Sequence, residues 1–235
     1  MFFAMCGRFA LGIPKKRLEE VFGLAVPDDY APSYNVAPGT GVLAVEGAGF
    51  TRRLWGLVPP WADDPGVGKR FINARSETVF DKPSFRESAL HHRLLIPAQT
   101  FYEWRREAGG RTPFAFALDG QDCFAMAGIG ASRTDSHTGE VLETMAVLTC
   151  PPNAVMAPVH DRMPVILPPE VWSAWLDPVA SMESLSSLLV PYPAKAMRVW
   201  PVSSRVNSPV TDGPELLKPV PAGEHVGGPK QGSLL

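Results

Sequence analysis

The chain has 235 residues, of which 45% are apolar and 20% charged, and its formal net charge is −2. This length suits one large domain with a substantial core. No apolar run approaches the roughly 20 residues of a transmembrane helix, and the first residues lack the features of a signal peptide. Three widely spaced cysteines form neither a disulfide framework nor a zinc pattern. We therefore expect a cytoplasmic protein with no metal and no other cofactor.

Hydrophobic periodicity and turn residues predict short helices and short strands in irregular order. The expected helices are 14–23, 84–92, 170–176 and 181–189. The expected strands are 42–46, 50–57, 94–97, 114–118, 123–129, 143–149, 165–167 and 198–202. Gly47-Ala48-Gly49 predicts one hairpin turn and Asp119-Gly120 a second, which would join strands 114–118 and 123–129. This pattern indicates an α+β fold: a single domain with a mixed or antiparallel, barrel-like β core and flanking short helices.

Basic residues are concentrated in the middle of the chain. Residues 51–111 hold 11 of the 22 Lys and Arg against 7 of the 24 Asp and Glu, interleaved with aromatic residues. Cations beside aromatic rings are typical of a groove for single-stranded nucleic acid, where cations follow the phosphates and rings stack on bases. The same pattern also fits an ordinary solvated surface over an aromatic core.

Cys6, in the stretch Met5-Cys6-Gly7-Arg8-Phe9, is a candidate for covalent chemistry. If the preceding residues were removed, Cys6 would carry a free α-amine beside its thiol. Such an aminothiol condenses with an aldehyde to a Schiff base, and the sulfur then closes a thiazolidine ring. The simpler interpretation is a small buried hydrophobic residue.

Four further polar residues stand in apolar or aromatic surroundings. Glu103 lies between Tyr102 and Trp104, where desolvation would raise its pKa and suit it to proton transfer. His160 has charged neighbours, and a histidine in such a place could move protons. Asn73 and Arg75 are a candidate amide donor and a candidate phosphate clamp. An exposed carboxylate and a structural histidine are the alternatives for Glu103 and His160.

The motifs resemble those of a known family when they are taken together. They are Met5-Cys6-Gly7-Arg8-Phe9, Tyr34-Asn35-Val36-Ala37-Pro38-Gly39, Trp55-Gly56-Leu57-Val58-Pro59-Pro60-Trp61, Ile72-Asn73-Ala74-Arg75-Ser76-Glu77-Thr78, Phe101-Tyr102-Glu103-Trp104 and Val159-His160-Asp161-Arg162-Met163-Pro164. Pro201-Val202-Ser203 with Val206-Asn207 also fits. The chain resembles the SOS-response-associated peptidase family, also described as abasic-site processing proteins, from Cys6 to about Leu217.

The resemblance implies a barrel-like α+β fold and a DNA-damage function. A protein of this kind binds single-stranded DNA that carries an abasic site and links itself covalently to the ring-opened aldehyde. The implied catalytic residues are Cys6, Asn73, Glu103 and His160. The implied phosphate contacts are Arg8 and Arg75. Further candidate DNA contacts are Asn35, Pro38, Trp55, Trp61, Trp104 and Arg162, with the tryptophans as candidates for stacking against or wedging the flanking bases. His160 would protonate the sugar ring oxygen and Glu103 would shuttle protons, although these two roles could be exchanged.

The N-terminus departs from the family pattern, in which the cysteine directly follows the initiator methionine. Here Met1-Phe2-Phe3-Ala4 come first, and methionine removal would expose Phe2 rather than Cys6. Either translation starts at Met5, or the chain removes residues 1–5 itself through a thiol autopeptidase activity. We expect an extension over 1–5, a domain over 6–218, and a disordered tail rich in Pro, Gly and Ser over 219–235.

Two other functions remain open. One is a thiol peptidase in which Cys6 is the nucleophile, His160 the base and Asn73 the orienting residue. The other is a non-catalytic module that binds single-stranded DNA and would survive Cys6→Ala unchanged. We expect a monomer that is associated with the nucleoid if the source is bacterial, with abasic single-stranded DNA as its partner and no membrane contact.

Overall fold

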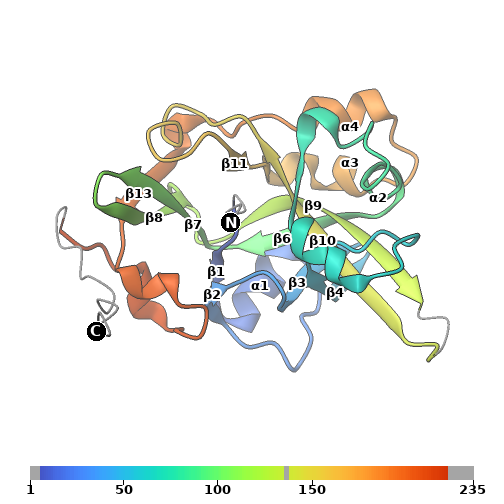
Figure 1. Cartoon of the computed structure of the whole chain (residues 1–235), viewed down its shortest axis with the longest axis horizontal. Helices are drawn as coiled ribbons and strands as arrows, with labels where there is room; N and C mark the ends of the chain where they lie inside the picture. The colour runs from blue at the N-terminus through green and yellow to red at the C-terminus, as the bar shows by residue number, and fades with distance from the viewer. Residues whose placement is uncertain (1–5, 135–137, 222–235) are drawn as a thin grey trace, which may run out of the picture.

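A closed five-stranded barrel forms the centre of the protein (Figure 1). The structure is a computed structural model and describes residues 6–134 and 138–221. The barrel strands are β3 (Gly41–Glu46), β4 (Gly49–Trp55), β6 (Arg93–Ala98), β9 (Phe124–Thr134) and β10 (Val141–Cys150). They pair in the order β10–β4–β3–β6–β9, and β9 pairs back onto β10 to close the ring. Because the β10–β4 pair is parallel and the others are antiparallel, the predicted mixed barrel is confirmed.

Three short strands extend the barrel sheet at its rim. Strand β5 (Asn73–Arg75) runs parallel to β10, and β11 (Met163–Pro164) pairs with the end of β10. Strand β12 (Ile166–Leu167) pairs with β9. The end of β10 therefore lies between the strand that holds Asn73 and the strand that follows His160.

A second sheet packs against the barrel. It comprises β1 (Phe9–Leu11), β2 (Ser33–Val36), β7 (Thr100–Glu107), β8 (Gly110–Leu118) and β13 (Met197–Pro201). The strand order is β13–β8–β7–β1–β2, with every pair antiparallel. Its inner face shares a core with the barrel, where Phe101 stacks on Phe116 with centroids 5.0 Å apart and Phe9 contacts Trp55 at 5.4 Å.

Four short α-helices flank the sheets as expected. They are α1 (Lys15–Phe22), α2 (Arg86–His91), α3 (Trp172–Leu176) and α4 (Met182–Leu188). Helix α1 ends where Gly23 adopts the left-handed conformation with φ 66° and its N–H bonds to Glu19. The start of the predicted third helix is a 3-10 turn, Pro169–Val171. Other 3-10 turns are Pro65–Arg70, Ser76–Thr78, Ala194–Ala196, Ser204–Asn207 and Pro214–Leu217. Among the described residues, no helix combines the length and apolarity needed to cross a bilayer.

The predicted hairpin across Asp119-Gly120 is wrong. The turn does form, since Gly120 has φ 69°, but its two strands enter different sheets. Strand β8 pairs with β7 and β13, whereas β9 pairs with β6, β10 and β12. The partners of β8 and β9 come from distant parts of the chain, and a local turn signal carries no information about them. The actual hairpin joins β7 to β8, with Glu107 opposite Gly110.

The structure bears on one predicted boundary, the start of the C-terminal tail at residue 219. Pro219 forms an isolated bridge with Val202, and the Val220 N–H bonds to the carbonyl of Pro201. The first residues of the predicted tail are therefore joined to the end of β13. The predicted extension over 1–5 and the rest of the tail, 222–235, lie outside the described residues.

Candidate active site

Cys6 and Glu103 are in direct contact although they are 97 residues apart in the chain. The backbone N–H of Cys6 donates a short hydrogen bond to Oε1 of Glu103. The contact follows from strand pairing, because Phe9 of β1 lies opposite Phe101 of β7 and the Tyr102 N–H bonds to the Arg8 carbonyl. An antiparallel pair continued in this register brings the residues before Phe9 alongside Glu103.

Burial raises the pKa of both side chains. Glu103 is 3% exposed and Cys6 is 5% exposed. Desolvation raises the pKa of the Glu103 carboxyl, opposed by His160 and by the Cys6 N–H. Burial, and then the neighbouring Glu103, raise the pKa of the Cys6 thiol well above its ordinary value. The site therefore pairs a thiol whose burial favours its protonated form with a carboxyl group placed to accept or donate a proton.

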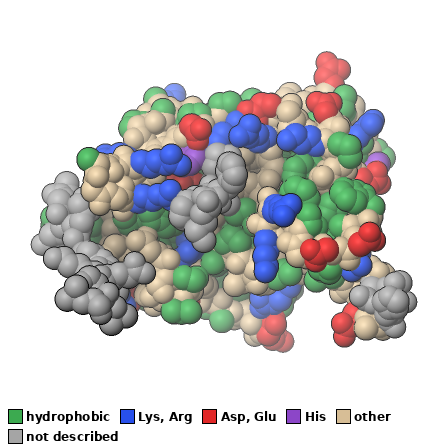
Figure 2. Space-filling model, in the orientation of Figure 1, with side chains coloured by type: hydrophobic (Ala, Val, Ile, Leu, Met, Phe, Trp, Pro, Cys, Tyr) green, Lys and Arg blue, Asp and Glu red, His purple; other side chains and the backbone are tan. Residues whose placement is uncertain are grey.

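A cavity of about 460 Å³ opens over this pair. Its lining is strongly basic, since three arginines and one histidine accompany one carboxyl group. The lining residues are Gly7, Arg8, Glu103, Trp104, Arg106, Arg111, His160 and Asn207. Figure 2 shows Lys and Arg side chains gathered across the middle of one face of the molecule, with a His among them. A basic cavity above a buried thiol fits an anionic substrate.

Asn73 has an unsatisfied side chain. It lies on β5, opposite Val147 of β10, and is half-buried. Both its amide nitrogen and its amide oxygen are shielded from solvent and have no hydrogen-bond partner. A shielded amide without partners costs free energy, and such groups are often reserved for a ligand.

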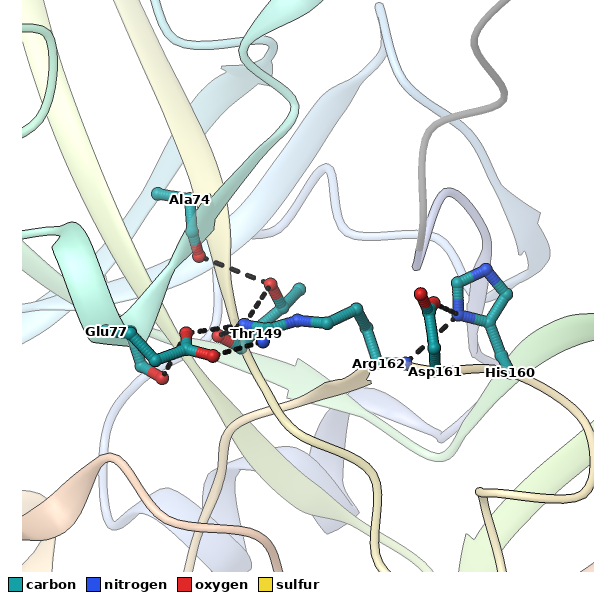
Figure 3. A network of polar contacts seen from close by, with 7 residues as sticks. Ala74, Glu77, Thr149, His160, Asp161 and Arg162 are labelled. Atoms are coloured by element: carbon teal, nitrogen blue, oxygen red, sulfur yellow. Dashed lines mark hydrogen bonds and ion pairs between the residues drawn. The ribbon is translucent and has the colours of Figure 1, made fainter.

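His160 lies where the turn after β10 ends, and its backbone N–H donates to the Met156 carbonyl. Its Nδ1 accepts a hydrogen bond of 3.1 Å from the Arg162 N–H and lies 3.0 Å from a carboxylate oxygen of Asp161 (Figure 3). Nδ1 can accept from Arg162 when it carries no proton, and can donate to Asp161 when it does. Both protonation states of His160 thus have a partner in place, as a proton-transfer residue requires.

Arg162, predicted as a DNA contact, instead has internal partners (Figure 3). Its guanidinium binds both carboxylate oxygens of Glu77, and Nη2 also donates to the Thr149 carbonyl at 2.6 Å. Arg162 is 8% exposed, so its charge is neutralised by the protein. The prediction for Arg162 is corrected, because its guanidinium anchors the loop that carries His160.

We expect Glu77→Gln to destabilise the protein by about 1 to 2 kcal/mol at neutral pH, since it leaves the buried Arg162 charge uncompensated. Arg162 lowers the pKa of Glu77 to about 2. A carboxyl whose pKa is lowered on folding stabilises above its ordinary pKa of about 4.3 and loses that contribution as the pH falls toward 2. Urea unfolding should show that the difference in free energy of unfolding between wild type and Glu77→Gln is smaller at pH 2.5 than at pH 7. Glu87→Gln, on the exposed face of α2, is the control; an equal effect there would contradict the assignment.

Arg8 and Asn35 form one unit. Nη1 of Arg8 donates to Oδ1 of Asn35 at 2.8 Å and to the Val206 carbonyl at 2.7 Å. The Asn35 amide in turn donates to the carbonyls of Ser208 and Thr211. Asn35 is buried and its hydrogen bonds are used internally, so its predicted DNA contact is corrected to the positioning of Arg8. Arg8 lines the cavity and stays a candidate phosphate contact.

The three predicted stacking tryptophans have different surroundings. Trp55 is 2% exposed, contacts Phe9 and donates to the Ile72 carbonyl. The prediction that Trp55 stacks on bases is therefore wrong, because β4 turns this side chain into the core. Trp104 lines the cavity and donates to Asn207 at 2.7 Å. Trp61 is 63% exposed. Trp61 and Trp104 remain candidates for stacking.

The remaining predicted contacts are accessible. Arg75 is exposed at the end of β5, and Pro38 is half-buried in the loop after β2. Sequence reasoning missed Glu77, Arg106 and Arg111. A predicted hairpin between 100–107 and 110–118 would have placed the two arginines beside the cavity. The prediction instead paired 114–118 with 123–129 across Asp119-Gly120.

Fold and site together define a barrel protein in which a buried Cys–Glu pair lies beneath a basic cavity. Residues 5–209 match the profile of the family described as "SOS response associated peptidase (SRAP)". The chain belongs to this family, which confirms the resemblance seen in the sequence.

Similar proteins cover nearly the whole chain. The abasic site processing protein YoqW of Bacillus subtilis is 42% identical over 223 residues, which span 91% of this chain and 99% of that protein. The abasic site processing protein YedK of Escherichia coli is 33% identical, over 92% of this chain and 100% of that protein. A crystal structure of a protein from Bacteroides thetaiotaomicron superposes with a TM-score of 0.86 at 25% identity, over 92% of this chain and 100% of that one.

Proposed function

We propose that the protein processes abasic sites in single-stranded DNA by forming a covalent thiazolidine crosslink through Cys6. The contact between the Cys6 nitrogen and Glu103 beneath a basic cavity is the observation that carries this proposal. The similar proteins YoqW and YedK are named abasic site processing proteins, and this chain matches each over more than nine-tenths of its length. The crosslink would shield the lesion within the DNA damage response.

The Cys6 nitrogen is the proposed nucleophile. Once residues 1–5 are absent, the α-amine of Cys6 occupies the place of the amide that now donates to Glu103. An α-ammonium has a pKa near ~8, so it must lose a proton before it attacks, and Glu103 is in contact to take it. The amine then condenses with the C1′ aldehyde and releases water. The thiol adds to the resulting imine carbon, passes its proton to the nitrogen, and closes the ring.

Two other residues have roles in this sequence. Most abasic deoxyribose is a closed hemiacetal, and a proton must reach the ring oxygen to release the aldehyde. His160 lines the same cavity as Glu103 and has a partner for each protonation state, so we assign it this step. The unpartnered amide of Asn73 would hold the thiazolidine by hydrogen bonds.

The residues before Cys6 must be absent for this chemistry. Translation from Met5 followed by methionine removal would achieve this, and so would self-cleavage at the Met5–Cys6 bond by a thiol autopeptidase activity. Cys6 has φ 45°, a left-handed conformation that residues other than glycine rarely adopt. Strain of this kind is concentrated at functional sites, which favours a special role for this bond.

The raised thiol pKa argues against a thiol peptidase, whether it acts on other proteins or on residues 1–5, and so favours translation from Met5. A cysteine nucleophile is normally activated by a lowered pKa or a paired histidine. Burial raises the pKa of the Cys6 thiol, and its first contact is an acidic group. A thiol that attacks an imine already formed beside it needs no such activation.

A crosslinking assay tests the proposal. The protein is incubated with a single-stranded oligonucleotide carrying one abasic site, and the products are separated under denaturing conditions. We expect a slow-migrating, heat-stable adduct with the wild-type protein and none with Cys6→Ala. An adduct of equal yield with Cys6→Ala would contradict the proposal, as would binding without any adduct, the behaviour expected of a non-catalytic module.

A further inference from the structure

One wall of the active-site cavity is built from two distant parts of the chain. Trp104 lies on β7, and Asn207 ends the 3-10 turn Ser204–Asn207. Nε1 of Trp104 donates a hydrogen bond of 2.7 Å to Oδ1 of Asn207, across 103 positions of sequence. Both residues line the cavity that also contains Glu103 and His160. The bond therefore ties an aromatic ring of the cavity wall to the C-terminal part of the fold.

This bond fixes which end of the Asn207 amide faces the indole. An indole N–H can only donate, so the Asn207 atom that receives it must be the oxygen. The Asn207 side chain makes no other hydrogen bond to any residue that the structure describes. Holding Trp104 is thus the single interaction that we can assign to this amide within the protein.

The residue before Asn207 holds a cation beside the same indole. The carbonyl of Val206 accepts a hydrogen bond of 2.7 Å from Nη1 of Arg8. The guanidinium carbon of Arg8 lies 6.0 Å from the centroid of the Trp104 ring. Nε of Arg8 is shielded from solvent and has no hydrogen-bond partner. Two consecutive residues of one turn therefore hold a ring and a cation together at the cavity.

The indole of Trp104 is only partly fixed by packing. Trp104 is half-buried, because one part of it packs against a small hydrophobic cluster while another part lines the cavity. The buried members of that cluster are Ala10, Tyr102, Ala115, Val202, Val206 and Leu216. A half-buried side chain can occupy more than one rotamer, and a hydrogen bond to a fixed acceptor selects one of them.

We propose that Asn207 is a positioning residue that holds the Trp104 indole in place to stack on the base next to the abasic site. The inference rests on the proposed function and names a residue that sets how the flanking nucleotide binds. Bases stack on aromatic side chains in grooves for single-stranded DNA, and arginine adds attraction at the same place. A ring that is already fixed loses less conformational freedom when the base binds, which strengthens binding.

The test measures stacking directly. The oligonucleotide carries a tetrahydrofuran analogue of the abasic site, which cannot form the aldehyde, and 2-aminopurine on one side of the analogue or the other. Stacking on an aromatic ring quenches the fluorescence of 2-aminopurine. The signal at saturating protein therefore reports stacking, and the titration reports affinity. Trp104→Ala identifies the position that Trp104 quenches; equal quenching by this variant at both positions would overturn the inference.

We expect Asn207→Ala to bind about three- to tenfold more weakly, as for the loss of one hydrogen bond, and to quench less than wild type at saturation. Asn207→Asp keeps an oxygen for the indole, so it should quench as wild type does even though its added charge weakens binding. The matched control is Gln121→Ala, which removes an amide from an exposed residue outside this cavity and should match wild type in both measurements.

Trp104 and Asn207 should act as one unit. Trp104→Phe removes the same hydrogen bond from the other side, so it should weaken binding at least as much as Asn207→Ala, and it replaces that variant if Asn207→Ala fails to fold. In the Trp104→Phe background, Asn207→Ala should change the affinity by less than about twofold. A full effect in that background, or wild-type quenching by Asn207→Ala, would overturn the inference.

The wild-type protein separates the two proposals. If it neither binds the analogue nor forms an adduct with an abasic oligonucleotide, the proposed function fails and the inference falls with it. If it forms the adduct while Asn207→Ala keeps the wild-type affinity and quenching, only the positioning role of Asn207 is wrong.

Discussion

Replacing Glu103 by Gln should slow crosslink formation by about 100-fold or more, within the range for loss of a general base. The amide cannot take the proton that the Cys6 α-ammonium must lose. Raising the pH toward 9 should restore part of the rate, since an α-amine with a pKa near ~8 then loses its proton to solvent. Rates measured from pH 6 to 9 by quenched time courses test this. A rate within twofold of wild type at neutral pH would remove Glu103 from the mechanism.

In the full chain, where Cys6 presents an amide N–H rather than an ammonium to Glu103, the same substitution should raise the melting temperature at neutral pH. Burial raises the pKa of Glu103 on folding. The neutral carboxyl stabilises the fold at pH values below its ordinary pKa of about 4.3, and this contribution is lost as the pH rises through the raised folded-state pKa. The increase in melting temperature of Glu103→Gln over wild type should therefore be present at pH 7 to 8 and absent at pH 4. Glu87→Gln, which is exposed on α2, should show no gain at either pH.

Replacing Cys6 by Ser should abolish the stable adduct without abolishing attack on the lesion. The amine can still form a Schiff base, but the thiol that closes the thiazolidine is absent. A Schiff base promotes β-elimination, so strand cleavage at the abasic site should increase relative to wild type. Borohydride should trap the imine as a reduced adduct.

Both products are followed on one denaturing gel, with Cys6→Ala as the companion variant that keeps the amine and also lacks the thiol. Cys6→Ser and Cys6→Ala should behave alike, because in each the Schiff base cannot close to a thiazolidine. A heat-stable adduct from Cys6→Ser without borohydride would show that the sulfur is not needed, and would contradict ring closure.

The sequence predicts elements whose signals are local. Helix α1 follows from the apolar face of Leu18, Val21 and Phe22 and the glycine after it, and the β3–β4 hairpin follows from its glycine turn. The sequence predicts a barrel-like core but not which strands close it, because closure depends on pairings such as β9 with β10 and β10 with β4. The hairpin at Asp119-Gly120 failed for the same reason, because a turn does not choose the partner of the strand after it.

The candidate site depends on contacts between distant residues. Cys6 and Glu103 are 97 residues apart, and Glu77 and Arg162 are 85 apart. Family resemblance placed the first pair in one site, whereas no spacing rule indicates that Glu77 neutralises Arg162. Trp55 was misassigned because an aromatic residue near a strand end can face solvent or core, and only the register of β4 decides which. Arg106 and Arg111 became neighbours only once β7 and β8 were paired.

The mass of the intact protein tests the central claim most directly. The chain is produced from Met5, and its mass is measured alone and after incubation with a single-stranded oligonucleotide carrying one abasic site. We predict a protein that begins at Cys6 and gains the mass of the oligonucleotide less one water. A protein that begins at Cys6, binds the oligonucleotide and keeps its own mass unchanged would contradict covalent processing through Cys6.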